Sequence, residues 1–178
     1  MRIARFAAAV LSVGLLACGD PLPPIETCEA TETLEPICGF QNPEDLAVLP
    51  DGEWLVVSQA PRRDAAGSLL GFRPSDGARR NLWAGDAEPA EPSAAACPGP
   101  PARDTWVPHG IDVTADGGSL LLVSHGGREA VDVFAIRASA NGPALVWTDC
   151  VPMPEDAVMN DVAALPDGSG FVVTQMAS

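Results

Sequence analysis

Short apolar runs separated by polar turns recur along the chain in a repeated pattern. Residues 45–59 read DLAVLPDGEWLVVSQ and residues 161–175 read DVAALPDGSGFVVTQ, identical at 9 of 15 aligned positions. A looser copy at residues 110–125, GIDVTADGGSLLLVSH, has one extra glycine at the turn. Turn sequences such as Pro-Asp-Gly supply the fixed and positive φ angles that a tight turn needs. Each copy is therefore predicted to form a β-hairpin, and its recurrence indicates a repeat architecture.

Two more strand-like runs follow each of the first two hairpins. They lie at residues 68–72 and 80–83 in the first unit, and at residues 130–137 and 144–147 in the second. No stretch beyond the first 20 residues has a helical period. The sequence therefore predicts an all-β protein, a β-propeller with about two and a half four-stranded blades, whose third unit stops at Ser178. A sandwich of similar hairpins is the alternative, but it does not explain why whole four-strand units recur.

A closed propeller typically has about 4–8 blades. The chain is accordingly expected to be the first part of a longer protein, with an incomplete set of blades. Its last strand would then leave an unpaired edge, which favours association.

The first 17 residues have the pattern of an export signal. Arg2 and Arg5 precede an apolar run of 11 residues, Phe6 to Leu16, which is about half the length of a membrane-spanning helix. The run ends in Leu-Leu-Ala-Cys-Gly, which resembles a bacterial lipobox and implies that Cys18 carries a lipid and begins the mature chain. An ordinary signal peptide that contains a cysteine is the alternative. The predicted location is the bacterial cell envelope, on the periplasmic or outer-membrane face.

The composition of the chain after the signal predicts two regions, and its charge argues against some classes of partner. Residues 18–37 are rich in proline and acids and are predicted to be a tether, followed by the propeller part at residues 38–178. After the signal, 8 arginines stand against 24 acidic residues, a formal charge of −16. Such a surface repels phosphate, which argues against nucleic acid and anionic membranes as partners. Membrane contact is expected only through the lipid on Cys18.

Four cysteines remain in the mature chain, namely Cys28, Cys38, Cys97 and Cys150. An even number in an exported protein favours disulfides, and four cysteines allow three connectivities. The preferred pairing is Cys97 with Cys150, because each precedes the polar residue at the head of a repeat copy by 12 or 10 residues. Cys28 and Cys38 would then close a local loop. The spacings are not typical of a zinc site.

A polar residue stands directly before or at the start of each repeat copy: Glu44, His109 and Asn160. The innermost strands of propeller blades line a central channel, so these three side chains are expected to converge at one end of it. Asp45 and Asp161 follow two of them. Carboxylate and amide oxygens suit Ca²⁺, which takes 6–8 oxygen ligands, and a buried carboxylate is costly without a cation. The alternative is that these acids and the asparagine only cap a loop and form a turn.

His109 and His125 are the only histidines of the chain. Two imidazoles near one channel could transfer a proton between water and a substrate near neutral pH. A purely structural role is the alternative. The sequence has no Gly-x-Ser-x-Gly, P-loop or Cys-x-x-Cys motif, which argues against serine hydrolases, nucleotide-binding proteins and thioredoxin-like enzymes.

Four short motifs in order resemble the paraoxonase/arylesterase group, within the wider SMP-30/gluconolactonase-like class of six-bladed β-propellers. They are Glu44-Asp-Leu-Ala-Val-Leu-Pro-Asp-Gly, Pro108-His-Gly-Ile, Leu121-Leu-Val-Ser-His and Asn160-Asp-Val. The resemblance covers about residues 40–178, which would correspond to the first half of that fold.

The resemblance implies two calcium ions in the central tunnel. Glu44 and Asn160 would hold the upper, catalytic calcium. Asp45, the main-chain carbonyl of Ile111 and Asp161 would hold the deeper, structural calcium. The family's other ligands come from later blades, so this chain by itself would hold half a site and is expected to be inactive alone.

The implied activity is calcium-dependent hydrolysis of small lactones or aryl esters. His109 would be the general base and His125 its partner, and the catalytic calcium would polarise the carbonyl of the substrate. Two alternatives remain, because a fold does not determine a function. One is a non-catalytic propeller lipoprotein that binds a ligand or a protein, and the other is a truncated chain without activity.

Overall fold

The computed structural model describes residues 27–88, 97–154 and 156–176, and in these residues the protein is all-β. The chain divides into two compact units, Met1–Cys38 and Gly39–Ser178. The described part of the first unit contains the Cys28–Cys38 disulfide. The predicted signal and the lipidation residue Cys18 lie outside the described residues. None of the described segments is a helix long and apolar enough to cross a membrane.

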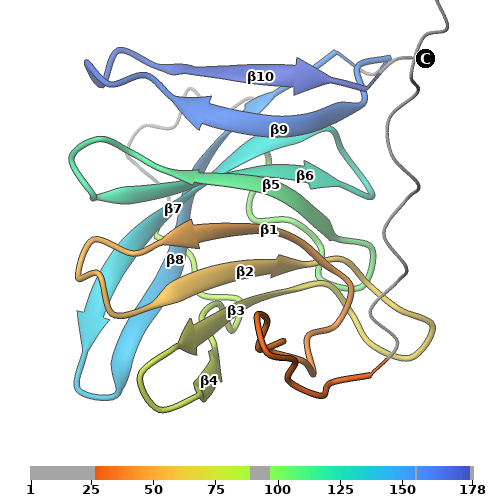
Figure 1. Ribbon diagram of the computed structural model, residues 1–178. Coiled ribbons are helices and arrows are strands. Elements are labelled where there is room, and N and C mark those ends of the chain that lie inside the picture. The colour runs from red at the N-terminus through yellow and green to blue at the C-terminus, as the bar shows by residue number, and fades with distance from the viewer. Residues whose placement is uncertain (1–26, 89–96, 155, 177–178) are drawn as a thin grey trace, which may run out of the picture. The chain divides into compact units, whose positions relative to one another are not determined.

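The described part of the second unit contains three antiparallel sheets, two of them four-stranded meanders of sequential strands and the third a hairpin (Figure 1). The first sheet consists of β1 Pro43–Val48, β2 Leu55–Gln59, β3 Ser68–Arg73 and β4 Ala78–Asn81. The second consists of β5 Val107–Val113, β6 Ser119–His125, β7 Ala130–Ser139 and β8 Gly142–Pro152. The third consists of β9 Met159–Ala164 and β10 Phe171–Gln175. The all-β prediction and the three hairpins are confirmed, and no sheet closes on itself in the described part of the chain.

Two strands differ from their predicted bounds. The strand expected at residues 80–83 is β4, which begins at Ala78 because Gly77, with a φ of 71°, ends the preceding turn there. Leu82 and Trp83 lie beyond the end of β4 and are buried in the core, although the Leu82 N–H still donates to the Leu69 carbonyl on β3. The strand expected at residues 144–147 is the 11-residue β8, because it pairs along the whole length of β7.

The three hairpin turns repeat one geometry. Each ends in a glycine with a left-handed φ: 69° at Gly52, 70° at Gly117 and 72° at Gly168. Each of these glycines donates its N–H to the carbonyl three residues earlier. An aspartate in the turn accepts a following backbone N–H. The Gly118 amide and the Thr114 hydroxyl thereby hold the pKa of Asp116 below its usual value. Local chemistry therefore explains why these segments turn where they do.

The first strands of the three sheets, β1, β5 and β9, lie side by side (Figure 1). Aspartates join them, because Asp45 Oδ2 accepts the Ile111 N–H at 2.8 Å and Asp112 Oδ2 accepts the Ala164 N–H at 2.8 Å. At Gly110 a side chain is impossible without movement, since a Cβ there would lie 2.5 Å from the Asp161 Cα. The repeat heads on these strands are thus held close to one another.

Apolar side chains fill the space between successive sheets. Trp83, Trp106 and Phe134 form the aromatic centre of the larger cluster, with edge-to-face ring centroids 4.8 Å and 5.3 Å from Trp83. A smaller cluster joins the second and third sheets through buried side chains of β6, β7 and β9, including Leu121 and Val162. The burial of these side chains is the main force that holds the sheets face to face.

Candidate active site around two histidines

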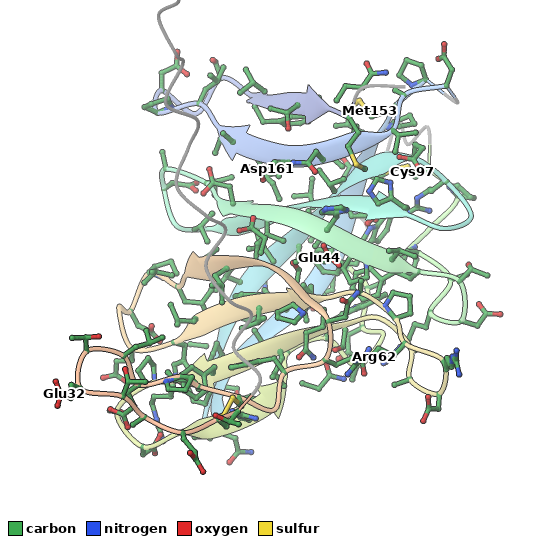
Figure 2. The ribbon with its side chains drawn as sticks, turned by 45° about the vertical axis from the view of Figure 1, so that its right-hand side comes forward. Glu32, Glu44, Arg62, Cys97, Met153 and Asp161 are labelled. Atoms are coloured by element: carbon green, nitrogen blue, oxygen red, sulfur yellow. A yellow bond between two sulfur atoms is a disulfide. The ribbon has the colours of Figure 1, made fainter. Side chains whose placement is uncertain are left out.

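The structure brings two of the three repeat-head residues into contact. Glu44 lies on β1 and His109 on β5, and Glu44 Oε2 is 3.6 Å from His109 Nε2. Asn160 lies on β9, and its main-chain carbonyl is next to Gly110. Within the described residues, the Asn160 side chain makes no hydrogen bond to Glu44 or His109. Figure 2 shows Glu44 and Asp161 on either side of β5.

His109 belongs to a continuous row of four polar side chains. Glu129 Oε2 is 2.7 Å from His125 Nδ1, and His125 Nε2 is 3.3 Å from His109 Nδ1. His109 Nε2 then faces Glu44. All four side chains are partly buried, with exposed fractions of 20% for Glu129, 13% for His125, 23% for His109 and 27% for Glu44. His125 is thus the most shielded of the four, and both carboxylates at the ends of the row remain accessible to water.

Strand register places the two imidazoles together. His125 is the last residue of β6 and pairs with Val107 on β5. The register shifts between Pro108 and Ile111, and this irregularity turns the His109 ring toward His125. The rings meet edge to face, with centroids 5.3 Å apart. The pair thus depends on a β-bulge and not only on the strand alternation.

A glycine turn brings Glu129 back to His125. Gly126 and Gly127 have φ angles of 79° and 104°, which L-residues rarely adopt. A Cβ on Gly126 would lie 1.8 Å from the Thr105 carbonyl oxygen, because the preceding loop passes directly over the turn. The two glycines thereby let the chain reverse tightly enough for Glu129 to contact the ring four residues earlier.

Hydrogen-bond logic assigns the protons of the row. An ionised Glu129 can only accept, so His125 Nδ1 carries the hydrogen and, in a neutral ring, His125 Nε2 accepts. His109 Nδ1 must then donate, which leaves His109 Nε2 with a free lone pair. That lone pair faces a second acceptor, Glu44 Oε2, at 3.6 Å. A proton donor such as water fits this arrangement, because two acceptors do not bond to each other.

A buried ion pair supports the turn that carries Glu129. Arg128 Nη2 is 2.5 Å from Asp132 Oδ1, and Asp132 is fully buried on β7. The same Asp132 oxygen accepts the Trp147 indole N–H at 2.8 Å. Arg128 also donates to the Gly99 carbonyl at 2.8 Å, which ties the loop before β5 to the turn.

Two of the predicted calcium ligands already bond to the backbone. Asp45 uses both carboxylate oxygens for backbone amides, those of Leu46 and Ile111. Asp161 Oδ1 accepts the Val162 N–H at 2.8 Å. No group of three or more His, Cys, Asp or Glu residues in the described ranges is placed to hold a metal ion. The donor types fit Ca²⁺, whereas the donors that these residues bring together are fewer than the 6–8 it takes.

Both preferred disulfides are present. Cys97 pairs with Cys150, with Cα atoms 6.1 Å apart, and Cys28 pairs with Cys38, with Cα atoms 6.0 Å apart. The first joins the loop before β5 to β8, in the same sheet as the two histidines.

Sequence reasoning missed Glu129 and the Arg128–Asp132 pair. A signal for Glu129 was present, because His125-Gly-Gly-Arg-Glu combines a histidine, a tight glycine turn and an acid four residues later. No comparable signal marked Asp132, which occupies one position of an otherwise apolar alternating strand.

No protein-family model, curated protein or solved structure matches the chain. The likeness to the arylesterase group therefore rests on the four motifs quoted above, and the chemistry of the site rests on its geometry.

Proposed function

We propose that the chain forms two and a half blades of a β-propeller that belongs to a calcium-dependent hydrolase of lactones or aryl esters. The repeated turn geometry and the adjacent strands β1, β5 and β9 support the propeller, because innermost strands of successive blades lie side by side around a channel. The two disulfides support export to an oxidising compartment, in agreement with a lipid-anchored envelope protein.

The observation that carries the activity is the His109–His125 contact with Glu129 behind it. In this proposal His109 Nε2 takes a proton from a water molecule, and the water oxygen forms a bond to the carbonyl carbon of the substrate. The bond to the leaving oxygen then breaks, and His109 returns the proton to that oxygen. Glu129 holds His125, and through it His109, in the tautomer that leaves Nε2 free to accept.

Calcium would be held by oxygen donors on β1, β5 and β9. Glu44 and Asn160 would hold the ion beside His109, and Asp45, the Ile111 carbonyl and Asp161 would hold a deeper one. When bound, a calcium ion would polarise the carbonyl of the substrate and stabilise the negative charge that develops on its oxygen.

Removal of calcium tests the proposal directly. In the natural protein, EDTA is expected to lower the rate of phenyl acetate and lactone hydrolysis by about a hundredfold, because a main stabiliser of the oxyanion is lost. Added Ca²⁺ should restore the rate, while an equal concentration of Mg²⁺ serves as the control, since Mg²⁺ demands a smaller octahedral site. If neither EDTA nor the His109→Gln substitution changes the rate of hydrolysis, the mechanism is ruled out.

Exchange of Glu129 for glutamine tests the proton assignment. A glutamine N–H can donate to His125 Nδ1 and reverse both tautomers, so that His109 Nε2 carries a hydrogen and cannot act as a base. We expect kcat to fall by about a hundredfold with KM nearly unchanged. The control is Glu53→Gln, in the exposed turn between β1 and β2. Equal kcat values for the two variants would contradict the assignment.

One observation favours a second function, that of a non-catalytic binding propeller. Both Asp45 carboxylate oxygens already serve the backbone of β1 and β5, which is a structural use of a predicted metal ligand. In that case the natural protein would hydrolyse neither esters nor lactones, whether or not Ca²⁺ is added.

A further inference from the structure

A hollow of about 430 Å³ lies against His125. Its walls come from the loop before β5 and from the glycine turn after β6. The residues that define it are Pro98, Pro100, Pro101, Ala102, His125 and Arg128. Its volume falls within the range of about 300–1,000 Å³ that is usual for small-molecule sites. Neither the proton assignment nor the calcium ligands make use of this space.

The chemistry of the walls selects an apolar, uncharged occupant. Proline nitrogens carry no hydrogen, so the loop offers few donors to a ligand. The one charged side chain, Arg128, directs its two terminal nitrogens to the Gly99 carbonyl and to Asp132, while its buried Nε makes no hydrogen bond within the described residues. Ser124 at the floor already accepts the Trp106 indole N–H at 3.0 Å. The strongly negative net charge of the protein also repels anionic ligands.

The hollow is held open before any ligand arrives. The Cys97–Cys150 disulfide anchors one end of the loop, and the Arg128 hydrogen bond to Gly99 anchors its middle. Thr105 lies on Gly126, where no side chain could fit. A preformed site costs little ordering entropy on binding.

We propose that this hollow binds the apolar acyl chain or aryl ring of an ester substrate, beside His125, the partner of the proposed general base. The proposal rests on the proposed hydrolase function for its catalytic meaning, because His125 both lines the hollow and contacts the general base. Each methylene that enters the hollow is expected to tighten binding by about fourfold until the space is filled.

A filling substitution tests the assignment. Ala102 is exposed and lines the hollow, so Ala102→Phe places a ring in it without disturbing a buried contact. Ala102→Ser keeps the hollow open and is the matched variant. Ala140→Phe places the same ring in a separate hollow beside Asn141, and controls for a general effect of an added aromatic.

Binding is measured without catalysis, by saturation-transfer NMR on the natural protein with N-methyloctanamide and, for comparison, N-methylacetamide. We expect N-methyloctanamide to bind the parent, Ala102→Ser and Ala140→Phe proteins, and to bind Ala102→Phe at least tenfold more weakly. Hydrolysis of phenyl octanoate relative to phenyl acetate should fall by the same factor in Ala102→Phe only. If Ala102→Phe melts well below the parent, the proposal is judged on Ala102→Leu in the same two assays.

The outcomes separate the two proposals. Equal binding of N-methyloctanamide by Ala102→Phe and Ala140→Phe overturns the assignment of the hollow, even where hydrolysis is normal. Selective loss of binding in Ala102→Phe, together with no ester hydrolysis by the parent protein, supports an apolar site and refutes the hydrolase function.

Discussion

Replacement of His109 by glutamine is expected to lower the kcat of ester hydrolysis by about 10²- to 10⁴-fold, the usual contribution of general acid–base catalysis. Glutamine keeps a polar side chain of similar reach but has no basic nitrogen. The free lone pair of His109 Nε2, which faces Glu44 at 3.6 Å, is the group that is lost. The measurement is steady-state hydrolysis of phenyl acetate by the natural protein, with the melting temperature followed in parallel.

The partner residue provides the sharper comparison. His125→Gln should also lower kcat, because the neutral tautomer of His109 is no longer enforced. The double variant should be scarcely slower than His109→Gln alone, since residues that act as one unit give non-additive losses. Multiplicative losses would show that the two histidines act independently, and a large drop in melting temperature for His109→Gln would indicate a structural role.

Removal of the Cys97–Cys150 disulfide is expected to lower the free energy of unfolding by about 4 kcal/mol. The bond spans 53 residues, and a long closed loop restricts the unfolded chain strongly. It also joins the loop before β5 to β8, so its loss frees the segment that forms one wall of the hollow. Urea titration of the Cys97→Ser/Cys150→Ser variant measures the change, with fluorescence of the buried Trp83 and Trp106 as the signal.

The second disulfide is the matched control. Cys28 and Cys38 are 10 residues apart and lie in the other compact unit, Met1–Cys38. Cys28→Ser/Cys38→Ser should therefore leave the unfolding of Gly39–Ser178 unchanged. If both double variants shift the urea midpoint equally, the long loop closure has no special effect on stability.

Local patterns predicted the hairpins because a turn is specified by adjacent residues. Gly52, Gly117 and Gly168 adopt the positive φ that their turn sequences require. Strand bounds were less predictable, because a partner strand sets them. β8 extends to 11 residues since β7 offers partners along its length, although the apolar run predicted only four residues.

The candidate site was predictable in part. The repeat alignment identified Glu44 and His109 as neighbours in space, and the structure places them 3.6 Å apart. The main-chain carbonyl of Asn160 lies next to Gly110, but within the described residues its side chain makes no hydrogen bond to the other two. The contact of Glu129 with His125 was not predicted, because it depends on the bend of a glycine turn and not on a position that recurs in the repeat.

The all-β character and the hairpin positions follow from the sequence, because they depend on turn residues and short-range alternation, and the spacing of the cysteines favoured one of three pairings. The contacts of Glu129 with His125 and of Asp45 with Ile111, and the hollow beside His125, became evident only in the folded chain. These contacts depend on a β-bulge, on strand register and on a loop packed over a turn. Such features arise when segments far apart in the chain are packed together, and no local pattern of apolar and polar residues encodes them.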